Sequence, residues 1–264
     1  MVQSLYAEEK SSYSLFNPTP VNMLRDMSTD RPDQTESPIT VDAGHFQIEA
    51  DFVSFSQFKH DNATENGLTV ASVNFKVGLT NFSDIQFVLP AYTRIKTEVD
   101  DRDETVDGIS DLVTRFKFNI IGNDAGNLAL GIMPVIKWPT ASSELGNDEI
   151  EWGVIVPVGA DLPNGFGMGA MIEYDRLVDG SGTDWYNSIL LSGAVGRNLN
   201  DAVGAFVELI GEKTLEDDHD WQGAFSAGFT YGINANLQLD GGVVAGLTDE
   251  TDDIRLFCGI SFRK

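Results

Sequence analysis

Residues 73–89 read Val-Asn-Phe-Lys-Val-Gly-Leu-Thr-Asn-Phe-Ser-Asp-Ile-Gln-Phe-Val-Leu, and this stretch decides the fold. Apolar side chains occupy positions 73, 75, 77 and 79, and the alternation resumes at 85, 87 and 89. A β-strand turns successive side chains to opposite faces, so the pattern predicts two strands that each have one apolar face. The short joint Thr80-Asn-Phe-Ser leaves room only for a tight turn. The stretch therefore predicts an antiparallel hairpin.

The same alternation recurs through the rest of the chain. We expect twelve strands, at residues 45–57, 68–79, 84–95, 111–121, 127–138, 151–160, 166–176, 185–196, 203–211, 221–232, 237–247 and 254–262. Short joints alternate with long, mostly acidic ones at residues 59–67, 94–110, 139–150, 176–184, 212–220 and 248–253. Short turns at one end and polar loops at the other are typical of a transmembrane barrel. The sequence therefore predicts an all-β fold, an antiparallel transmembrane β-barrel of about 12 strands over residues 45–264.

The aromatic residues separate a membrane barrel from a soluble β-sandwich, which also has alternating strands. The tryptophans all lie in the apolar phase at the long-loop ends of their strands: Trp138, Trp152, Trp185 and Trp221. Other aromatic residues of the same phase lie near the short turns: Phe46, Phe118, Phe166, Tyr231 and Phe262. A bilayer interface selects two outward aromatic belts, whereas a sandwich core buries its tryptophans in mid-strand. The aromatic pattern therefore favours the membrane barrel.

Composition narrows the partners and the compartment. The 264 residues include 41 acidic and 17 basic side chains, and the net charge of −24 argues against nucleic acid, because phosphate binding needs clustered Lys and Arg. The acidic loops are either a solvated face or meet divalent cations that bridge lipopolysaccharide. We expect outer-membrane lipid, lipopolysaccharide, a small-molecule solute and the barrel-assembly machinery as partners. The first residues lack the features of a secretory signal, so we expect that a signal has been removed and that the protein lies in the bacterial outer membrane.

Residues 1–44 differ from the rest of the chain. They carry four prolines and little alternation, with one short helical possibility near residues 21–27. The segment is either disordered or lodged in the lumen as a plug, and the sequence leaves both interpretations open. Four of its charged side chains are natural partners for a charged barrel lining, and these are the plug candidates: Asp30, Arg31, Asp33 and Glu36.

The inward-facing phase of the strands carries charges of both signs. The basic candidates for the lumen lining are Lys76, Arg94, Arg115, Lys117 and Lys137. The acidic candidates are Glu49, Asp51, Glu173, Asp175, Glu208 and Asp240. Either a basic wall faces an acidic wall across an open lumen and orients polar solutes, or the charges pair with each other and close a barrel of this size.

Several segments resemble an outer-membrane family known as the meta-pathway of phenol degradation proteins. The matching segments are Ser28-Thr-Asp-Arg-Pro-Asp-Gln-Thr-Glu-Ser-Pro, Gly44-His-Phe-Gln-Ile-Glu-Ala, Gly108-Ile-Ser-Asp-Leu-Val-Thr-Arg-Phe-Lys-Phe and the pair Pro134…Pro139-Thr140. The resemblance implies an outer-membrane barrel, distantly similar to fatty-acid and aromatic-hydrocarbon channels, and a role in passing aromatic compounds. The chain departs from the family in its acidic loops and in the two basic residues after Phe262.

The chain carries little enzyme chemistry. Its histidines are His45, His60 and His219, and none has the serine pattern of an outer-membrane lipid hydrolase. Asp217-Asp-His-Asp-Trp superficially resembles the His-Asp pair of outer-membrane proteases, but a histidine in an acidic loop is usually solvated. Gly165-Phe-Gly-Met-Gly-Ala lacks the following helix that a phosphate-binding loop requires. We therefore predict that the protein is not an enzyme and has no catalytic residues, cofactor or dedicated metal site.

Three functional hypotheses follow. The first is a passive channel or uptake protein for small, hydrophobic or aromatic molecules, gated by residues 28–38 and lined by Lys76, Arg94, Arg115 and Lys117. The alternative is a closed structural or adhesive barrel whose acidic loops carry the function. The third is an outer-membrane hydrolase that acts through Asp218 and His219.

Overall fold

The computed structural model describes residues 10–60, 63–99, 102–142, 145–179, 182–216 and 220–264. In these ranges the chain forms strands and two single-turn 3-10 helices, η1 (Val21–Met23) and η2 (Pro163–Gly165). The strands are β1 (Phe46–His60), β2 (Ala63–Thr80), β3 (Ser83–Val99), β4 (Arg102–Gly108), β5 (Leu112–Ile121), β6 (Leu128–Trp138), β7 (Glu151–Leu162), β8 (Phe166–Val178), β9 (Trp185–Asn198), β10 (Val203–Thr214), β11 (Gln222–Asn234), β12 (Leu237–Gly246) and β13 (Ile254–Arg263). Among the described residues, no helix has the length and apolarity needed to span a bilayer.

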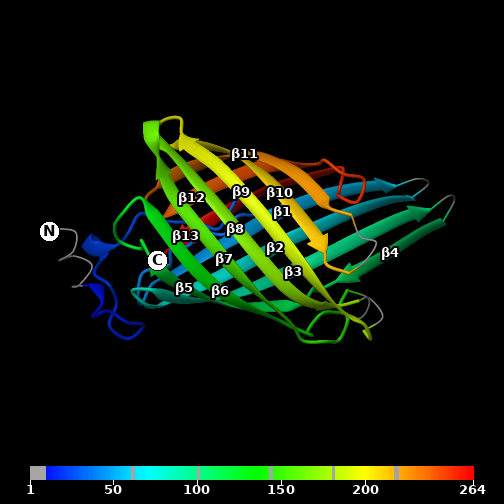
Figure 1. The fold of residues 1–264 in the computed structure, drawn as a ribbon, viewed down its shortest axis with the longest axis horizontal. Helices are drawn as coiled ribbons and strands as arrows, with labels where there is room; N and C mark the ends of the chain where they lie inside the picture. Colours follow the sequence, from blue (N-terminus) through cyan, green and yellow to red (C-terminus); the bar gives the residue numbers. More distant parts are fainter. Residues whose placement is uncertain (1–9, 61–62, 100–101, 143–144, 180–181, 217–219) are drawn as a thin grey trace.

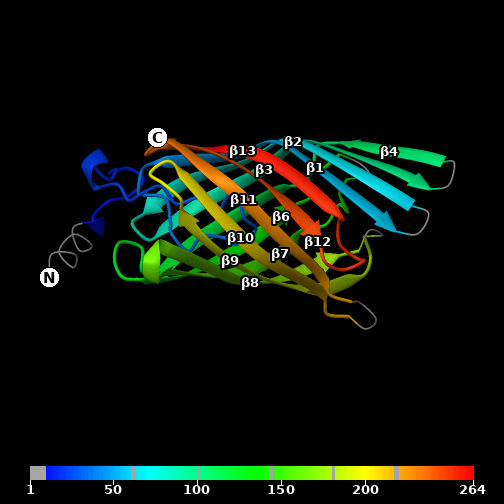
Figure 2. The ribbon, with the colours of Figure 1, turned by 90° about the horizontal axis from the view of Figure 1, so that it is seen from above.

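The strands form one antiparallel sheet that closes on itself (Figure 1, Figure 2). From β5 to β13 each strand pairs with the next, β13 pairs with β1, β1 with β2, β2 with β3, and β3 with β5. The ring therefore contains twelve strands, and the predicted fold class is confirmed. The remaining strand, β4, pairs with residues 93–99 of β3, beyond the part that pairs with β5. β4 and β5 thus occupy one interrupted strand position in the wall.

The two ends of the barrel differ. The C-terminus and the short turns lie at one end, and the long loops lie at the other (Figure 1). Backbone hydrogen bonds of 3.0 and 2.9 Å between Phe46 and Lys264 join the first and last strands at the short-turn end. Every neighbouring pair among the twelve described strands of the ring is hydrogen-bonded, so this ring closes without a free sheet edge, as a strand-built structure in lipid requires, whereas β4 pairs with β3 alone.

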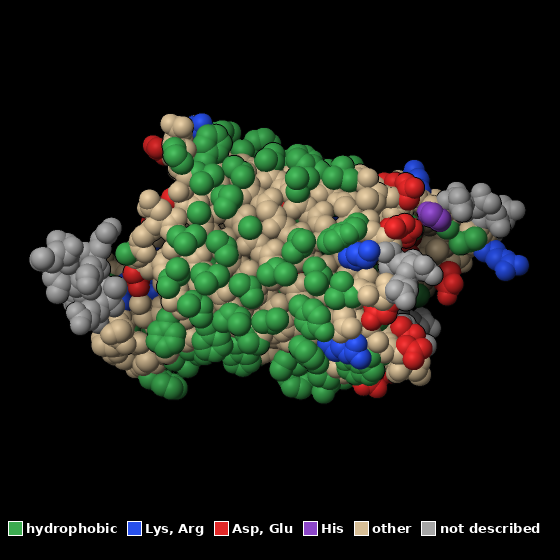
Figure 3. Space-filling view, in the orientation of Figure 1, with side chains coloured by type: hydrophobic (Ala, Val, Ile, Leu, Met, Phe, Trp, Pro, Cys, Tyr) green, Lys and Arg blue, Asp and Glu red, His purple; other side chains and the backbone are tan. Residues whose placement is uncertain are grey.

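Polar side chains fill the interior of the barrel and apolar side chains cover its exterior, which is the reverse of the arrangement in a soluble protein. Many of the largest fully buried side chains are polar or charged, including Lys76, Lys117, Gln47, Gln86, Glu49 and Glu208. The buried apolar cluster consists of Met133, Ile155 and Met171. Hydrophobic side chains cover the body of the barrel, and charged side chains gather at the long-loop end (Figure 3). An apolar exterior around a polar interior suits a lipid environment.

The tryptophans lie on this apolar exterior. Trp138, Trp152, Trp185 and Trp221 are 37%, 49%, 40% and 44% exposed. Trp138 ends β6, whereas the other three lie at or next to the beginning of β7, β9 and β11, so all of them lie toward the long loops. Their role at the membrane interface remains a prediction, and this placement is the one that it requires.

Two of the predicted long loops are largely strand, so the prediction of their structure is wrong. β1 and β2 continue to His60 and Ala63 within the loop predicted at 59–67, and β4 lies within the loop predicted at 94–110. These strands extend past the rest of the wall at the loop end (Figure 1). The sequence of β4, RDETVDG, is mostly exposed and has no apolar phase. Water replaces lipid beyond the membrane, so the alternation that predicts the other strands is not needed there.

Candidate functional site

Residues 24–44, called the inner segment below, run through the interior of the barrel. Their polar contacts reach side chains on β1, β5, β9, β10 and β12, which are strands from around the whole ring. A segment outside the wall could not contact all of these strands at once. The inner segment therefore crosses the lumen.

Asp42 and Asp124 hold the inner segment at the short-turn end. Lys10 Nζ lies 3.1 Å from Asp42 Oδ1 and 3.0 Å from Asp124 Oδ1, and Arg25 Nε lies 2.9 Å from the same Asp124 oxygen. Arg25 also donates to the carbonyl oxygen of Asn81 at 2.6 Å. Asn81 and Asp124 belong to two short turns, so these contacts tie the inner segment to the rim of the barrel.

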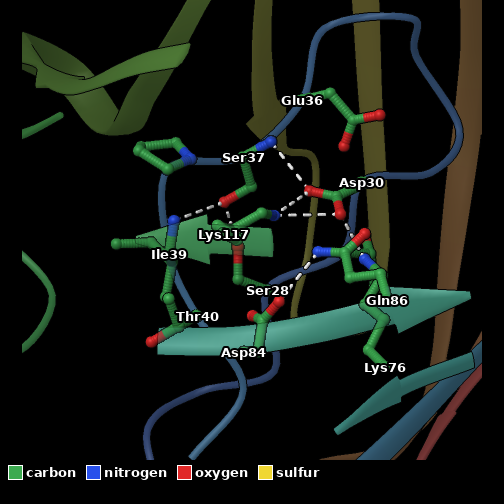
Figure 4. A network of polar contacts seen from close by, with 12 residues as sticks. Ser28, Asp30, Glu36, Ser37, Ile39, Thr40, Lys76, Asp84, Gln86 and Lys117 are labelled. Carbon is green, nitrogen blue, oxygen red and sulfur yellow. Dashed lines mark hydrogen bonds and ion pairs between the residues drawn. The ribbon is translucent and has the colours of Figure 1, made fainter. Parts of the chain in front are cut away.

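Asp30 is the centre of the charge network inside the barrel (Figure 4). Lys117 Nζ contacts its two carboxylate oxygens at 2.7 and 2.9 Å, and Lys76 pairs with both Asp30 and Glu49. The backbone N–H groups of Asp30 and Arg31 each donate to Glu49 Oε2 at 3.0 Å. Burial opposes ionisation of Asp30, but Lys117 and Lys76 hold its pKa well below the usual range. Two lysines and two carboxylates thus neutralise one another.

Arg31 is a basic residue of the inner segment that pairs with carboxylates of the barrel wall. Its guanidinium pairs with Asp51 on β1 and with Asp240 on β12, each at 2.6 Å. The planar fork of an arginine can bind two carboxylates at once, so one side chain bridges two strands. The guanidinium also lies 6.0 Å from the centroid of the Phe257 ring.

Glu208 on β10 anchors the middle of the inner segment. The N–H groups of Gln34 and Thr35 donate to its carboxylate at 3.0 and 2.8 Å, and the Thr35 hydroxyl donates at 2.7 Å. The same hydroxyl lies 2.7 Å from the Ser192 hydroxyl on β9. These three donors supply the hydrogen bonds that a carboxylate receives from water when it is exposed.

The lumen-lining candidates divide into two groups. Those in contact with the inner segment are Glu49, Asp51, Lys76, Arg115, Lys117, Glu208 and Asp240. The others lie apart from it. Arg94 is exposed in the outer part of β3 opposite β4, and Lys137 pairs with Asp111 at 3.1 Å and Glu151 at 2.7 Å. Glu173 is half-buried on β8.

The plug candidates also differ from one another. Asp30 and Arg31 form the ion pairs described above, and Glu36 Oε1 accepts a hydrogen bond of 2.5 Å from Arg115. Asp33 forms no ion pair with any cation in the described part of the chain. Acidic residues of the inner segment thus pair with basic side chains on β2 and β5, and Arg31 pairs with acidic side chains on β1 and β12.

The sequence analysis missed Asp42, which is 1% exposed and forms ion pairs with Lys10, Arg25 and Arg263. It also missed Thr35 and Ser192. These residues carry no pattern that marks them, because Asp42 and Thr35 lie in a stretch without alternation and a serine on an inward phase is common in barrels. Only the path of the inner segment identifies them.

Cavities lie on both sides of residues 31–33. One of about 340 Å³ extends toward the long loops and is lined by residues such as Ile210, Glu212 and Phe257. Another of about 610 Å³ extends toward the short turns, next to Phe166 and Gln238. Arg31, Pro32 and Asp33 line both cavities. A few residues of the inner segment therefore separate the two halves of the lumen.

Burial perturbs two acids of the inner segment. It raises the pKa of Asp33 to about 8, with Glu208 adding to the effect, and it raises the pKa of Glu36 to about 8 although Arg115 opposes the shift. Both acids therefore bind protons more tightly in the docked segment than they would in water.

Raising the pH from about 6 to about 9 is expected to loosen the inner segment. A raised acid pKa means that the docked state holds protons that the undocked state has lost, so docking weakens as the pH rises from the ordinary acid pKa toward about 8. The open probability in planar bilayers should rise roughly tenfold over this range. The variant Asp33→Asn with Glu36→Gln should abolish the dependence, and a wild-type channel that closes as the pH rises would contradict the assignment.

The hydrolase hypothesis falls on residues that the structure does not describe, because Asp217, Asp218 and His219 lie outside the described ranges. His45 contacts the carbonyl oxygen of Thr19 at 2.8 Å at the short-turn end. Within the described residues, no group of three or more His, Cys, Asp or Glu side chains is placed to hold a metal ion.

The closed ring, the apolar exterior and the polar interior define an outer-membrane β-barrel. Residues 29–263 match the family described as "Putative MetA-pathway of phenol degradation", and the chain belongs to this family. The resemblance identified in the sequence is therefore confirmed. No curated protein matches the sequence.

Solved structures of outer-membrane proteins share the fold. An outer-membrane channel from Pseudomonas putida F1 superimposes with a TM-score of 0.67 at 14% identity, covering 90% of this chain and 100% of that one. The NanC porin gives a TM-score of 0.51 at 14% identity, covering 82% and 98%. The translocator domain of the autotransporter NalP from Neisseria meningitidis gives 0.55 at 13% identity, covering 83% and 88%. At these identities the likeness concerns the fold.

Proposed function

We propose that the protein is a passive outer-membrane channel for small, hydrophobic or aromatic molecules, and that the inner segment is its plug and gate. Membership in a family named for phenol degradation supports the solute class. The similar structure from Pseudomonas putida F1 is described as an outer-membrane channel, which supports the mode of action.

The observation that carries the proposal is the pair of cavities on either side of residues 31–33. The cavities of about 340 and 610 Å³ are each large enough for a small solute, and Arg31, Pro32 and Asp33 belong to the walls of both. A modest displacement of these residues joins the two cavities into one path. The long-loop end then receives the solute and the short-turn end releases it.

A second candidate function is a closed structural or adhesive barrel. Its support is the set of buried ion pairs that hold the inner segment, since pairs such as Asp30–Lys117 and Arg31–Asp240 resist displacement. In that case the lumen stays shut and the acidic loops carry the activity. The two candidates differ in whether ions pass through the barrel.

Deleting residues 1–40 is expected to raise the single-channel conductance in planar bilayers severalfold, because the deletion removes the partition between the two cavities. Aromatic solutes such as phenol or toluene should reduce the current when they enter the lumen. The matched control is Phe16→Ser in the full chain, since this side chain is 94% exposed. A barrel that folds but carries no current with or without residues 1–40 would instead support the closed structural candidate.

A further inference from the structure

A small cavity lies between the inner segment and the wall formed by β1, β2, β3 and β5. Its volume is about 130 Å³, and its lining includes Glu36, Ser72, Asn74, Val88 and Arg115. A cavity of about 150 Å³ is known to accept one benzene ring, so this space is close to the size of a single ring.

Three residues that line this cavity each carry a buried polar atom without a hydrogen-bond partner in the described part of the chain: Glu36 Oε2, Asn74 Oδ1 and Arg115 Nε. Another polar group of each of these side chains is hydrogen-bonded. Arg115 binds the other Glu36 oxygen at 2.5 Å, and the Asn74 amide donates to Gln86 at 3.0 Å. Glu36 is only 7% exposed. Native proteins rarely leave buried polar atoms unpaired, so these three atoms are available to bond with a small molecule in the cavity.

The three atoms select the chemistry of that occupant. Arg115 Nε–H is a donor and Asn74 Oδ1 is an acceptor, whereas Glu36 Oε2 donates when the carboxyl group is protonated and accepts when it is ionised. A hydroxyl group complements them, because its oxygen accepts from the arginine and its hydrogen donates to the amide or the carboxylate. An anion would meet the nearby carboxylates of Glu36 and Asp51, and a cation would meet the guanidinium of Arg115. Val88 and the aliphatic stem of Arg115 supply carbon for an apolar body.

The cavity adjoins the route from the loop end. Arg31 and Asp51 line both this cavity and the cavity of about 340 Å³ that extends toward the long loops. The Arg31–Asp51 ion pair of 2.6 Å therefore lies between the two cavities, and a molecule from the loop end reaches the small cavity when this pair separates.

We propose that the cavity between Glu36, Asn74 and Arg115 binds the hydroxyl end of a small neutral molecule and makes the lumen prefer hydroxylated rings over hydrocarbons of the same shape. The inference rests on the proposed channel function and adds the specificity of its solute site. The hydroxyl group of the solute bonds to polar atoms that water would otherwise solvate.

The test compares 4-fluorophenol with 4-fluorotoluene, which differ in the hydroxyl group. Fluorine NMR measures the bound fraction of each in nanodiscs that hold the full-length barrel. The unaltered protein should bind the phenol about tenfold more tightly. Arg115→Lys keeps the charge beside Glu36 but removes the Nε–H, and Ser72→Leu fills the cavity, so both should abolish the preference. Arg176→Lys on β8, which contacts Asn187 and lies over the Trp185 ring, is the matched control.

Folding of each variant is checked by the compact band of an unboiled barrel on a gel. Because Arg115→Lys and Ser72→Leu change the cavity in different ways, the test remains decisive if one of them fails to fold. Equal binding of the two probes by the unaltered protein would overturn the inference, as would an unchanged preference in Ser72→Leu, because the cavity would then hold water only. Conductance tests the channel separately. A conducting barrel without the preference refutes only the hydroxyl site, whereas a non-conducting barrel with the preference refutes only the channel.

Discussion

Replacing Asp30 with alanine is expected to release the inner segment and to raise the single-channel conductance to that of the chain without residues 1–40. Asp30 is the shared counter-ion of Lys76 and Lys117, which are 2% and 1% exposed. Lys76 keeps Glu49, but Lys117 loses the carboxylate with which it pairs. Removing one partner of a buried ion pair costs about 3–5 kcal/mol, which shifts the docking equilibrium by roughly two to four orders of magnitude. Planar-bilayer recording measures the effect.

Two further variants separate charge from shape. Asp30→Asn keeps the size of the side chain and should behave like Asp30→Ala, because the lysines lose their counter-charge in both. Glu98→Ala removes one of the two carboxylate partners of Lys96 on the exposed part of β3, where an ion pair is worth about 0–1 kcal/mol, and should leave the conductance unchanged. If Asp30→Ala conducts no better than the unaltered protein, the ion pairs do not hold the gate.

The sequence predicts the strands where lipid covers one of their faces, and it fails where lipid is absent. Val73 and Phe75 lie in a phase that must be apolar outside and polar inside, so the period of two is strict there. β4 has water on both faces, and its polar sequence resembles that of a loop. The sequence does not predict the extensions of β1 and β2 beyond the membrane for the same reason. Backbone hydrogen bonds hold β4 and these extensions in the sheet, and such bonds require no particular side chains.

The charged residues of the candidate site could be predicted from the sequence, but the ion pairs that they form could not. An excess of charge in the inward phase requires counter-charges, and Asp30 and Arg31 stand out in a polar segment next to the first strand. Which acid meets which lysine depends on the path of the inner segment through the lumen, and the segment has no periodicity that fixes this path. Arg94 illustrates the limit, because its phase continues inward while its part of β3 lies beyond the site.

Cross-linking the inner segment to the wall is expected to abolish solute entry. The hydroxyls of Thr35 and Ser192 lie 2.7 Å apart, and the two residues are 5% and 8% exposed, so the pair Thr35→Cys with Ser192→Cys is well placed for a disulfide. The background variant Cys258→Ser removes the exposed native thiol. Oxidation should reduce the ionic current to that of empty membranes and abolish its change when solute is added, because the gate can no longer move, and reduction should restore both.

The single-cysteine variants control for the substitutions themselves, since each removes one hydroxyl but forms no cross-link. Their currents should not respond to oxidation. If the oxidised double variant passes solutes as well as the reduced one, the inner segment need not move, and solutes pass it through fixed space in the lumen. The inner segment would then be a lining of the channel rather than its gate, and the buried ion pairs would serve to shape a permanent path. Reversible loss of solute entry would instead require that residues 31–35 move whenever a molecule crosses.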